Sequence, residues 1–151
     1  MMDLWKVQLK IDSSNLARVR EIIKLYGGLP ARSQVGVGPS ETVFFVLQHA
    51  PDSVHSLYID MILEAAKDNE LDKSLAAMYH DRYLMHNGQD QLYGTQVRFD
   101  RTTDPLTNEE RDSAYVWPIA DTTNIDDLRY ENNLGPLEEY LSHFGLSRWK
   151  N

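Results

Sequence analysis

Apolar residues recur every three or four positions along much of this chain, which is the spacing of one face of an α-helix. The first stripe of this kind has five members: Leu16, Val19, Ile22, Ile23 and Tyr26. The run from Asp12 to Asn15 offers good N-cap residues just before it, and Gly27-Gly28 follows it. We therefore expect a first helix that begins near Asp12 and ends at Gly27, followed by a loop over residues 31–39.

A second helix is expected after Ser40, which can serve as its N-cap. Its body, residues 42–47, is apolar on every side. That pattern predicts a helix buried all round, and a buried strand is the alternative for so short a run.

Two further helices are expected before residue 88. Asp52 or Ser53 can cap the first of them, and Asp72 caps the second, which runs to about Met85 and ends at Asn87-Gly88. The apolar stripe of the first has six members: Val54, Leu57, Tyr58, Met61, Ile62 and Ala65.

After residue 88 the pattern changes. Residues 91–99 alternate loosely between polar and apolar side chains, so they predict an extended segment. The apolar run 115–117 can pair with residues 97–99 as an antiparallel hairpin, and the polar stretch 101–112 is expected to be a surface loop or a charged helical turn. A short helix capped by Asn124 and a last helix that begins at Pro136 complete the chain.

These elements predict a mainly α (α+β) fold, with at least four helices and a small antiparallel β-hairpin near Tyr93–Trp117. A length of 151 residues suits a single domain over residues 1–151. The doubled methionine at the N-terminus suggests a fragment that lacks an N-terminal segment. The sequence therefore allows two compartments: the cytoplasm, or an exported location if an N-terminal signal was removed.

Charge and composition exclude several function classes. The net charge is −8 and the basic residues are scattered, so nucleic-acid binding and a polybasic membrane contact are both disfavoured. The chain has no cysteine, which rules out thiolate zinc sites, thiol catalysis and disulfides. No run approaches the 18 apolar residues of a membrane span, and the five histidines show no metal-ligand spacing, so we expect neither a metal nor a cofactor.

Polar side chains mark three candidate places, and the pattern predicts burial at the first two. The first is Gln48-His49, at the end of the apolar run 42–47. His49 has two interpretations: a core histidine bonded to a backbone carbonyl, or a general base or donor to a substrate, because the pKa of an imidazole lies nearest neutrality.

The second place is Asp81-Arg82. Arg82 falls between Met78 and Met85 on the apolar stripe of its helix, so we expect it to be substantially buried and paired with a carboxylate or a backbone carbonyl. It would either form a salt bridge within the fold or anchor an anionic ligand. Asp81 turns about 100° away and is better placed to orient a residue of another element.

The third place is the segment 89–96, which holds three glutamines, a tyrosine and a glycine. Gln91, Tyr93 and Gln96 would suit hydrogen-bonded recognition of a small molecule, while a solvated hairpin edge is the alternative. Gly94 allows another backbone or a ligand to approach closely.

Taken in order, these motifs resemble a known family. The Gln-His-Ala triplet at 48–50, the Asp-Arg pair at 81–82 and the Tyr-Gly-Thr-Gln tetrapeptide at 93–96 are its most specific parts. With Gly28-Leu29-Pro30 and Leu134-Gly135 in place, the chain resembles a bacterial family of uncharacterised proteins, domain of unknown function 6624, over nearly its whole length. The resemblance implies no known reaction and assigns no role to Arg129.

Two functions are compatible with these residues. The first is a catalytic or small-ligand pocket, of hydrolase or transferase type, in which His49 acts as base and Arg82 holds an anion, with Gln48, Asp81, Gln91, Tyr93 and Gln96 as ligand-binding residues. The second is a non-catalytic protein-interaction domain in which the polar cluster is a buried structural network. The first predicts that His49, Arg82, Gln91 and Gln96 converge in one pocket. The partner is thus an unknown small molecule or protein, and the oligomeric state stays open.

Overall fold

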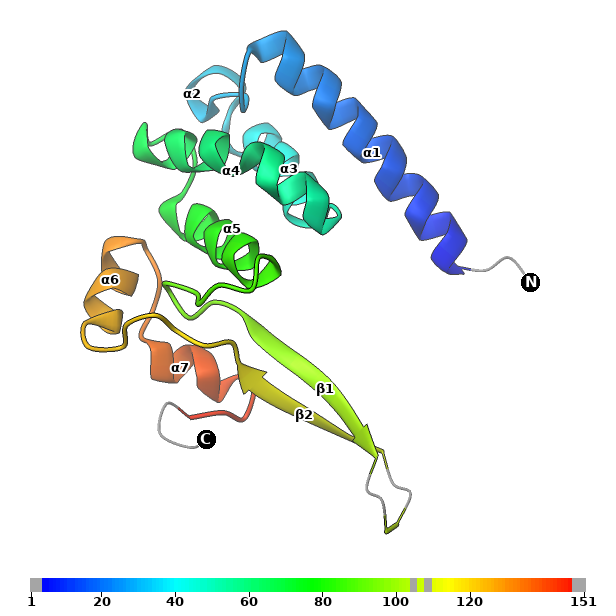
Figure 1. Cartoon of the computed structure of the whole chain (residues 1–151). Coiled ribbons are helices and arrows are strands. Elements are labelled where there is room, and N and C mark those ends of the chain that lie inside the picture. The colour runs from blue at the N-terminus through cyan, green and yellow to red at the C-terminus, as the bar shows by residue number, and fades with distance from the viewer. Residues whose placement is uncertain (1–3, 104–105, 108–109, 148–151) are drawn as a thin grey trace. The chain divides into compact units, whose positions relative to one another are not determined.

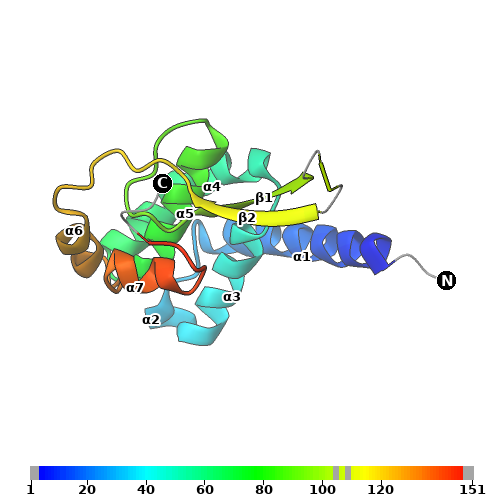
Figure 2. The same cartoon turned by 90° about the horizontal axis from the view of Figure 1, so that it is seen from below.

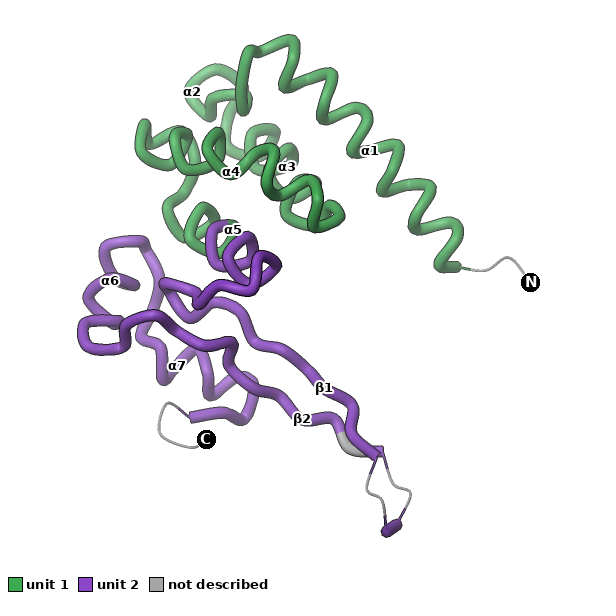
Figure 3. Tube along the Cα trace, in the orientation of Figure 1, with its two compact units in different colours: residues 1–79 green, residues 80–151 purple. Residues whose placement is uncertain are grey.

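Figure 1 shows the computed structural model, which describes residues 4–103, 106–107 and 110–147. Seven helices and a two-stranded antiparallel sheet in those residues confirm the mainly helical α+β class. The chain forms two compact units, Met1–Tyr79 and His80–Asn151 (Figure 3). Each unit is described by itself below, and the expectation of a single domain stays a prediction.

Unit 1 is helical. It contains α1 (Leu4–Tyr26), α2 (Arg32–Val35), α3 (Val37–Gln48), α4 (Asp52–Lys67) and the first half of α5 (Lys73–His86). The N-terminal end of the long α1 extends beyond the other helices of this unit (Figure 1, Figure 2). The buried apolar residues of the unit come mainly from α3 and α4, whereas α1 buries only Val19.

The expected start of the first helix was wrong. It begins by Leu4 and not near Asp12, and the cap-forming residues lie inside it. Two of them bond along the helix, since Ser13 Oγ donates to the Leu9 carbonyl at 2.7 Å and Gln8 donates to the Asp12 carboxylate at 2.7 Å. Capping residues therefore did not mark a helix end here.

The loop expected over residues 31–39 was also wrong. It contains α2 and the first turn of α3, separated by Gly36 at a positive φ of 86°. The Glu70 carboxylate holds the start of α2 by accepting bonds from the Ser33 N–H and hydroxyl, at 2.9 and 2.6 Å. Ser40 is buried inside α3 instead of capping it.

Residues 42–47 form a helix and not the alternative strand, but this helix is not buried all round. Val43, Phe44 and Leu47 are buried, whereas the Phe45 side chain is 46% exposed. In α4 the buried face is likewise rotated from the expected stripe, because Leu57 is 68% exposed and Ile59 is buried instead.

The expected limits of α5 are confirmed. The Asp72 carboxylate accepts bonds from the Ser74 N–H and hydroxyl at 2.8 and 2.6 Å, which satisfies a backbone donor of the first turn. Gly88, with a positive φ of 69°, follows the helix.

Unit 2 contains the hairpin and the last two helices. Strands β1 (Val97–Thr103) and β2 (Glu110–Val116) pair in a register that sets Val97 opposite Val116, as expected. The expected loop or helical turn over 101–112 was wrong at its two ends, because β1 continues to Thr103, β2 begins at Glu110, and Arg101 bonds Asp112 across the pair. Residues 106–107 form a turn, and residues 104–105 and 108–109 of this expectation lie outside the described residues. Segment 91–96 is irregular instead of extended, and only Gln91 forms an isolated bridge, with Ile119.

Helices α6 (Ile125–Glu131) and α7 (Leu137–Ser142) pack on the base of this hairpin. Their core consists of Ile125, Leu137 and Leu141, against which Val97 and Val116 pack. This core supports segment 91–96 from one side. Within the described ranges, no helix combines the length and the apolar composition needed to cross a lipid bilayer.

Candidate functional site

The Asp81 carboxylate is the centre of a polar cluster in unit 2. It is fully buried and accepts bonds from the backbone N–H groups of Leu92, Tyr93 and Thr95, at 2.7, 3.1 and 2.9 Å. It also accepts a bond from the Thr95 hydroxyl at 2.8 Å. One helical carboxylate thus satisfies the donors of an irregular segment that has no strand partner to do so.

Gln91 closes the same segment from within. Its side-chain amide donates to the carbonyls of Gln96 and Trp117, at 3.1 and 2.6 Å, and its Oε1 accepts the Gln96 N–H at 2.8 Å. Its own backbone groups bond Pro118 and Ala120. A fully buried amide with these partners acts as a structural link between segment 91–96 and the end of the hairpin.

Arg129 of α6 holds the opposite side of the segment. The guanidinium is buried and donates to the carbonyls of Gly135 and Tyr93, each at 2.6 Å. It also lies over the Tyr140 ring, 5.2 Å from the centroid. Burial lowers the pKa of Arg129, while nearby Tyr140 and carboxylates partly offset this effect.

Gly94 lies within the segment that Asp81 and Arg129 hold from two sides. Its φ is +69°, and a Cβ atom built there would lie 2.8 Å from Leu137 Cδ1 and 2.9 Å from Ile119 Cδ1. Both the backbone conformation and the close approach therefore require glycine.

We expect Gly94→Ala to lower the free energy of unfolding by about 2 kcal/mol, from the positive φ and from overlap with two packed side chains. Gly88→Ala is the matched control, because Gly88 has the same φ but a Cβ atom added to it would meet no other atom within 4 Å. The control should cost about 1 kcal/mol. Urea denaturation of both variants measures the difference, and equal losses would contradict the packing argument.

Arg82 is less buried than the sequence predicted, whereas Asp81 bonds residues of another segment, as expected. Asp81 is the fully buried one, whereas Arg82 is half-buried. The Arg82 Nε donates to the Gln96 side-chain oxygen at 3.4 Å. The arginine therefore lies beside the polar cluster, at its edge, and the aspartate forms its interior.

His80 and Tyr93 flank the cluster, with ring centroids 6.2 Å apart. Burial lowers the pKa of His80, which Asp81 partly opposes, and burial together with Asp81 raises the pKa of Tyr93. Both side chains are consequently neutral near pH 7. His80 Nδ1 is one of the buried polar atoms of the described residues without a hydrogen-bond partner.

His49 and Gln48 belong to unit 1. Gln48 is buried in the last turn of α3, and His49 follows it as an exposed residue. The core histidine is His55, whose Nε2 lies 3.3 Å from the Gln48 carbonyl oxygen and whose ring packs on Tyr79. His49 as a core histidine is therefore wrong.

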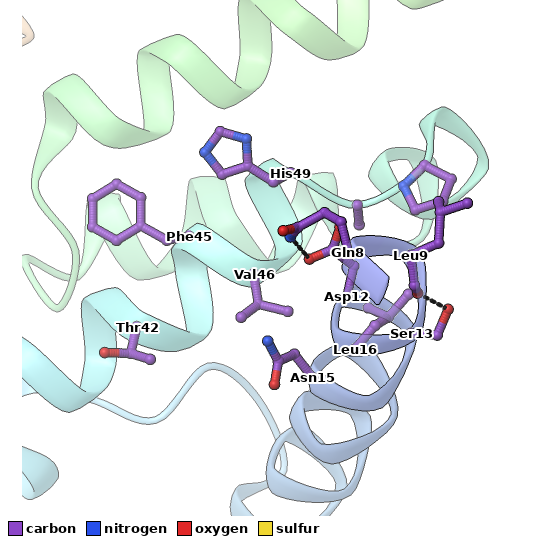
Figure 4. Close-up of a pocket in the computed structure, with 12 residues that line it drawn as sticks. Gln8, Leu9, Asp12, Ser13, Asn15, Leu16, Thr42, Phe45, Val46 and His49 are labelled. Carbon is purple, nitrogen blue, oxygen red and sulfur yellow. Dashed lines mark hydrogen bonds between the residues drawn. The ribbon is translucent and has the colours of Figure 1, made fainter. Parts of the chain in front are cut away.

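His49 lines a groove of about 730 Å³ between α1 and α3. The α1 wall is formed by Gln8, Leu9, Asp12, Ser13, Asn15 and Leu16. The other wall is formed by Thr42, Phe45, Val46, His49, Ala50 and Pro51 (Figure 4). Six of these twelve residues are apolar and six are polar, and four of the polar ones lie on α1.

The structure brings together four of the expected site residues, namely Asp81, Gln91, Tyr93 and Gln96, and sets Arg82 against the last of them. His49 and Gln48 lie in the other unit. Convergence of His49 with Arg82, Gln91 and Gln96 stays a prediction.

Sequence reasoning left Arg129 without a role and did not find the α1 wall of the groove. Arg129 stands four residues after Ile125, so both occupy one face of α6, and this spacing could have marked it as a buried arginine. No comparable local signal pairs α1 with α3.

The family model for a family of unknown function (DUF6624) matches residues 2–146. No curated protein and no solved structure matches this chain. The residues that suggested the resemblance include Asp81, Tyr93 and Gly94, which the structure gathers in one cluster. Because the match extends over nearly all of the sequence, the protein belongs to this family of unknown function.

Proposed function

We propose that this protein binds a small molecule with an apolar body and a polar end in the groove between α1 and α3. The observation that carries the proposal is the composition and size of the groove, about 730 Å³ with His49 in its lining. Sites for small molecules occupy roughly 300–1,000 Å³ and combine apolar walls with few polar groups.

The walls divide into an apolar part and a polar part. Leu9 and Leu16 of α1, with Phe45 and Val46 of α3, supply apolar side chains to the lining (Figure 4). These side chains would contact the apolar body of the ligand, with a favourable contribution of about 25 cal/mol per Å² removed from water.

Several polar groups in the lining already have partners. The Asp12 carboxylate accepts from Gln8 at 2.7 Å, and the Thr42 hydroxyl donates to the Gly38 carbonyl at 2.8 Å. The exposed imidazole of His49 can both donate and accept a hydrogen bond. We therefore assign His49 to the polar end of the ligand.

The polar cluster of unit 2 has a structural role in this proposal. The oxygens of Asp81, the amide of Gln91 and the guanidinium of Arg129 are bonded to the chain's own backbone. These bonds support one part of the interaction-domain hypothesis, namely that the polar cluster is a buried structural network. A base role for His49 and an anion-holding role for Arg82 remain predictions, since the two residues belong to different units.

The fluorescent probe 1-anilinonaphthalene-8-sulfonate tests the groove, because it has aromatic rings and one polar end. We expect saturable binding that Phe45→Gln weakens about tenfold or more, because the probe loses contact with a large apolar wall. A fluorescence titration of the folded protein measures the dissociation constant.

Phe99→Gln is the matched control. Phe99 is an exposed phenylalanine of β1, 62% accessible, and it does not line the groove. Binding that survives Phe99→Gln and is lost in Phe45→Gln supports the proposal. Equal binding by both variants, or no saturable binding by the natural chain, overturns it.

A further inference from the structure

We infer that α1 pairs with α1 of a second copy of this chain, antiparallel, through an outer stripe distinct from the groove. The outer stripe has seven members: Leu4, Val7, Ile11, Ser14, Arg18, Ile22 and Leu25. At 100° per residue they fall within an arc of about 80° of the helix surface. A second copy of the chain would be the protein partner that the sequence leaves open. This pairing does not depend on a ligand in the groove.

The stripe exposes apolar surface that the described part of unit 1 leaves uncovered. Leu4 is 83% exposed, Leu25 is 81% exposed and Ile11 is exposed as well, whereas Val7 and Ile22 are half-buried and present part of their side chains. Clustered apolar exposure of this kind on one helix face marks an interaction surface. The groove side of α1 is a different face, which carries Leu9, Asp12 and Leu16.

The stripe is complementary to itself when reversed. An antiparallel pair centred between Ser14 and Asn15 sets Leu4 of one copy opposite Leu25 of the other, and Val7 opposite Ile22. Ile11 then meets the aliphatic stem of Arg18. The contact is isologous, so each of these pairs occurs twice in a two-fold dimer.

The charges favour the antiparallel arrangement over a parallel one. Four basic residues of α1 lie off the stripe: Lys6, Lys10, Arg20 and Lys24. Arg18 is the one charged member of the stripe, and its guanidinium bonds Glu21 on its own helix at 2.8 Å. A parallel pair would set Arg18 against Arg18, whereas the antiparallel pair separates these residues by about 10 Å along the axis.

An anionic membrane is the other surface that a basic, amphipathic helix could contact. It fits α1 less well, because the face opposite the stripe would have to be polar but carries Leu9 and Leu16, which line the groove. A second copy needs only the stripe itself. We therefore commit to the second copy and make membrane binding an outcome of the test.

Cysteine cross-linking tests the pairing directly, because the natural chain has no cysteine. Under mild oxidation, Ser14→Cys should cross-link with itself, and a mixture of Leu4→Cys and Leu25→Cys should form the mixed dimer. Leu4→Cys alone should stay monomeric on a denaturing gel, since in this geometry the two copies of residue 4 lie about 31 Å apart. Self-linking of Leu4→Cys with no mixed product would overturn the antiparallel geometry.

Light scattering gives the second measurement. The natural chain should have twice the mass of one 17.4 kDa chain. Leu25→Glu should raise the dimer dissociation constant at least about 100-fold, because two symmetric contacts are lost, and Leu4→Glu mixed with Leu25→Lys should restore a dimer. Lys10→Glu, off the stripe, is the control.

A monomeric natural chain at about 100 µM, well above the micromolar range of specific dimers, would overturn the self-association. A monomer that binds vesicles containing phosphatidylglycerol would overturn it as well. Neither result would affect the groove proposal, whose probe titration uses a different face of α1. Circular dichroism of Leu25→Glu confirms that the variant is folded, and the exposure of Leu25 predicts that it is.

Discussion

Asp81→Ala should lower the free energy of unfolding by about 4 kcal/mol. The substitution removes the acceptor of three backbone N–H groups and one hydroxyl, contributed by Leu92, Tyr93 and Thr95. Each buried donor left without a partner costs about 1–3 kcal/mol, and a water that enters the space recovers part of this loss. Urea denaturation followed by circular dichroism measures the change.

Two further substitutions sharpen this result. Asp81→Asn should also destabilise the protein, because its NH₂ group faces donors where the carboxylate offered only acceptors. Asp90→Ala is the matched control, since Asp90 is an exposed aspartate of the same unit. A loss below about 1 kcal/mol for Asp81→Ala would show that the carboxylate does not hold segment 91–96.

Arg129→Met should lower the free energy of unfolding by about 3 kcal/mol. Methionine fills the space beside Tyr140 but leaves the carbonyls of Gly135 and Tyr93 without their donor. Arg129→Lys should recover only part of the loss, because a single ammonium cannot reproduce the planar guanidinium that serves separate carbonyls and lies over a ring.

Arg98→Met is the control for this experiment. Arg98 is an exposed residue of β1, so its replacement should change stability by less than about 0.5 kcal/mol. Thermal unfolding of the three variants at one protein concentration measures the series. Equal stabilities of Arg129→Met and the natural chain would contradict a structural role for the guanidinium.

The sequence predicted elements whose signals are local. Asp72 and Gly88 mark the two ends of α5, because a capping carboxylate and a residue of positive φ act within one helical turn. The pairing of residues 97–99 with 115–117 was predicted from two short apolar runs, and the register that sets Val97 opposite Val116 confirms it.

Other expectations failed for two different reasons. The capping residues Asp12 and Ser13 lie inside α1, where their side chains bond Gln8 and Leu9 one turn earlier instead of marking a helix end. Segment 91–96 is irregular because Asp81 and Gln91, and not a strand partner, take up its backbone groups. The spacing of polar and apolar residues does not indicate that Asp81 and Gln91 are these partners.

At the candidate site too, burial depends on contacts that the local pattern does not show. Asp81 is fully buried, whereas Arg82 is half-buried. The pattern of large apolar residues favoured Arg82 for the core, but the buried residues of α5 include Ala76, Ala77 and Tyr79, on a face rotated from that stripe. A carboxylate is stable in this interior only because several N–H donors of one segment converge on it.

By itself, the sequence determined the mainly helical class, the limits of α5, the hairpin and the residues of the family motifs, since each depends on neighbours along the chain. The tertiary structure decided which of those residues hold the fold and which lie at a groove. Asp81 and Arg129 stabilise segment 91–96 from two different helices, and His49 meets α1 across the groove. The hydrogen bonds among these contacts join residues from 11 to 36 positions apart, and bonds over such separations form only when packing has brought the elements together.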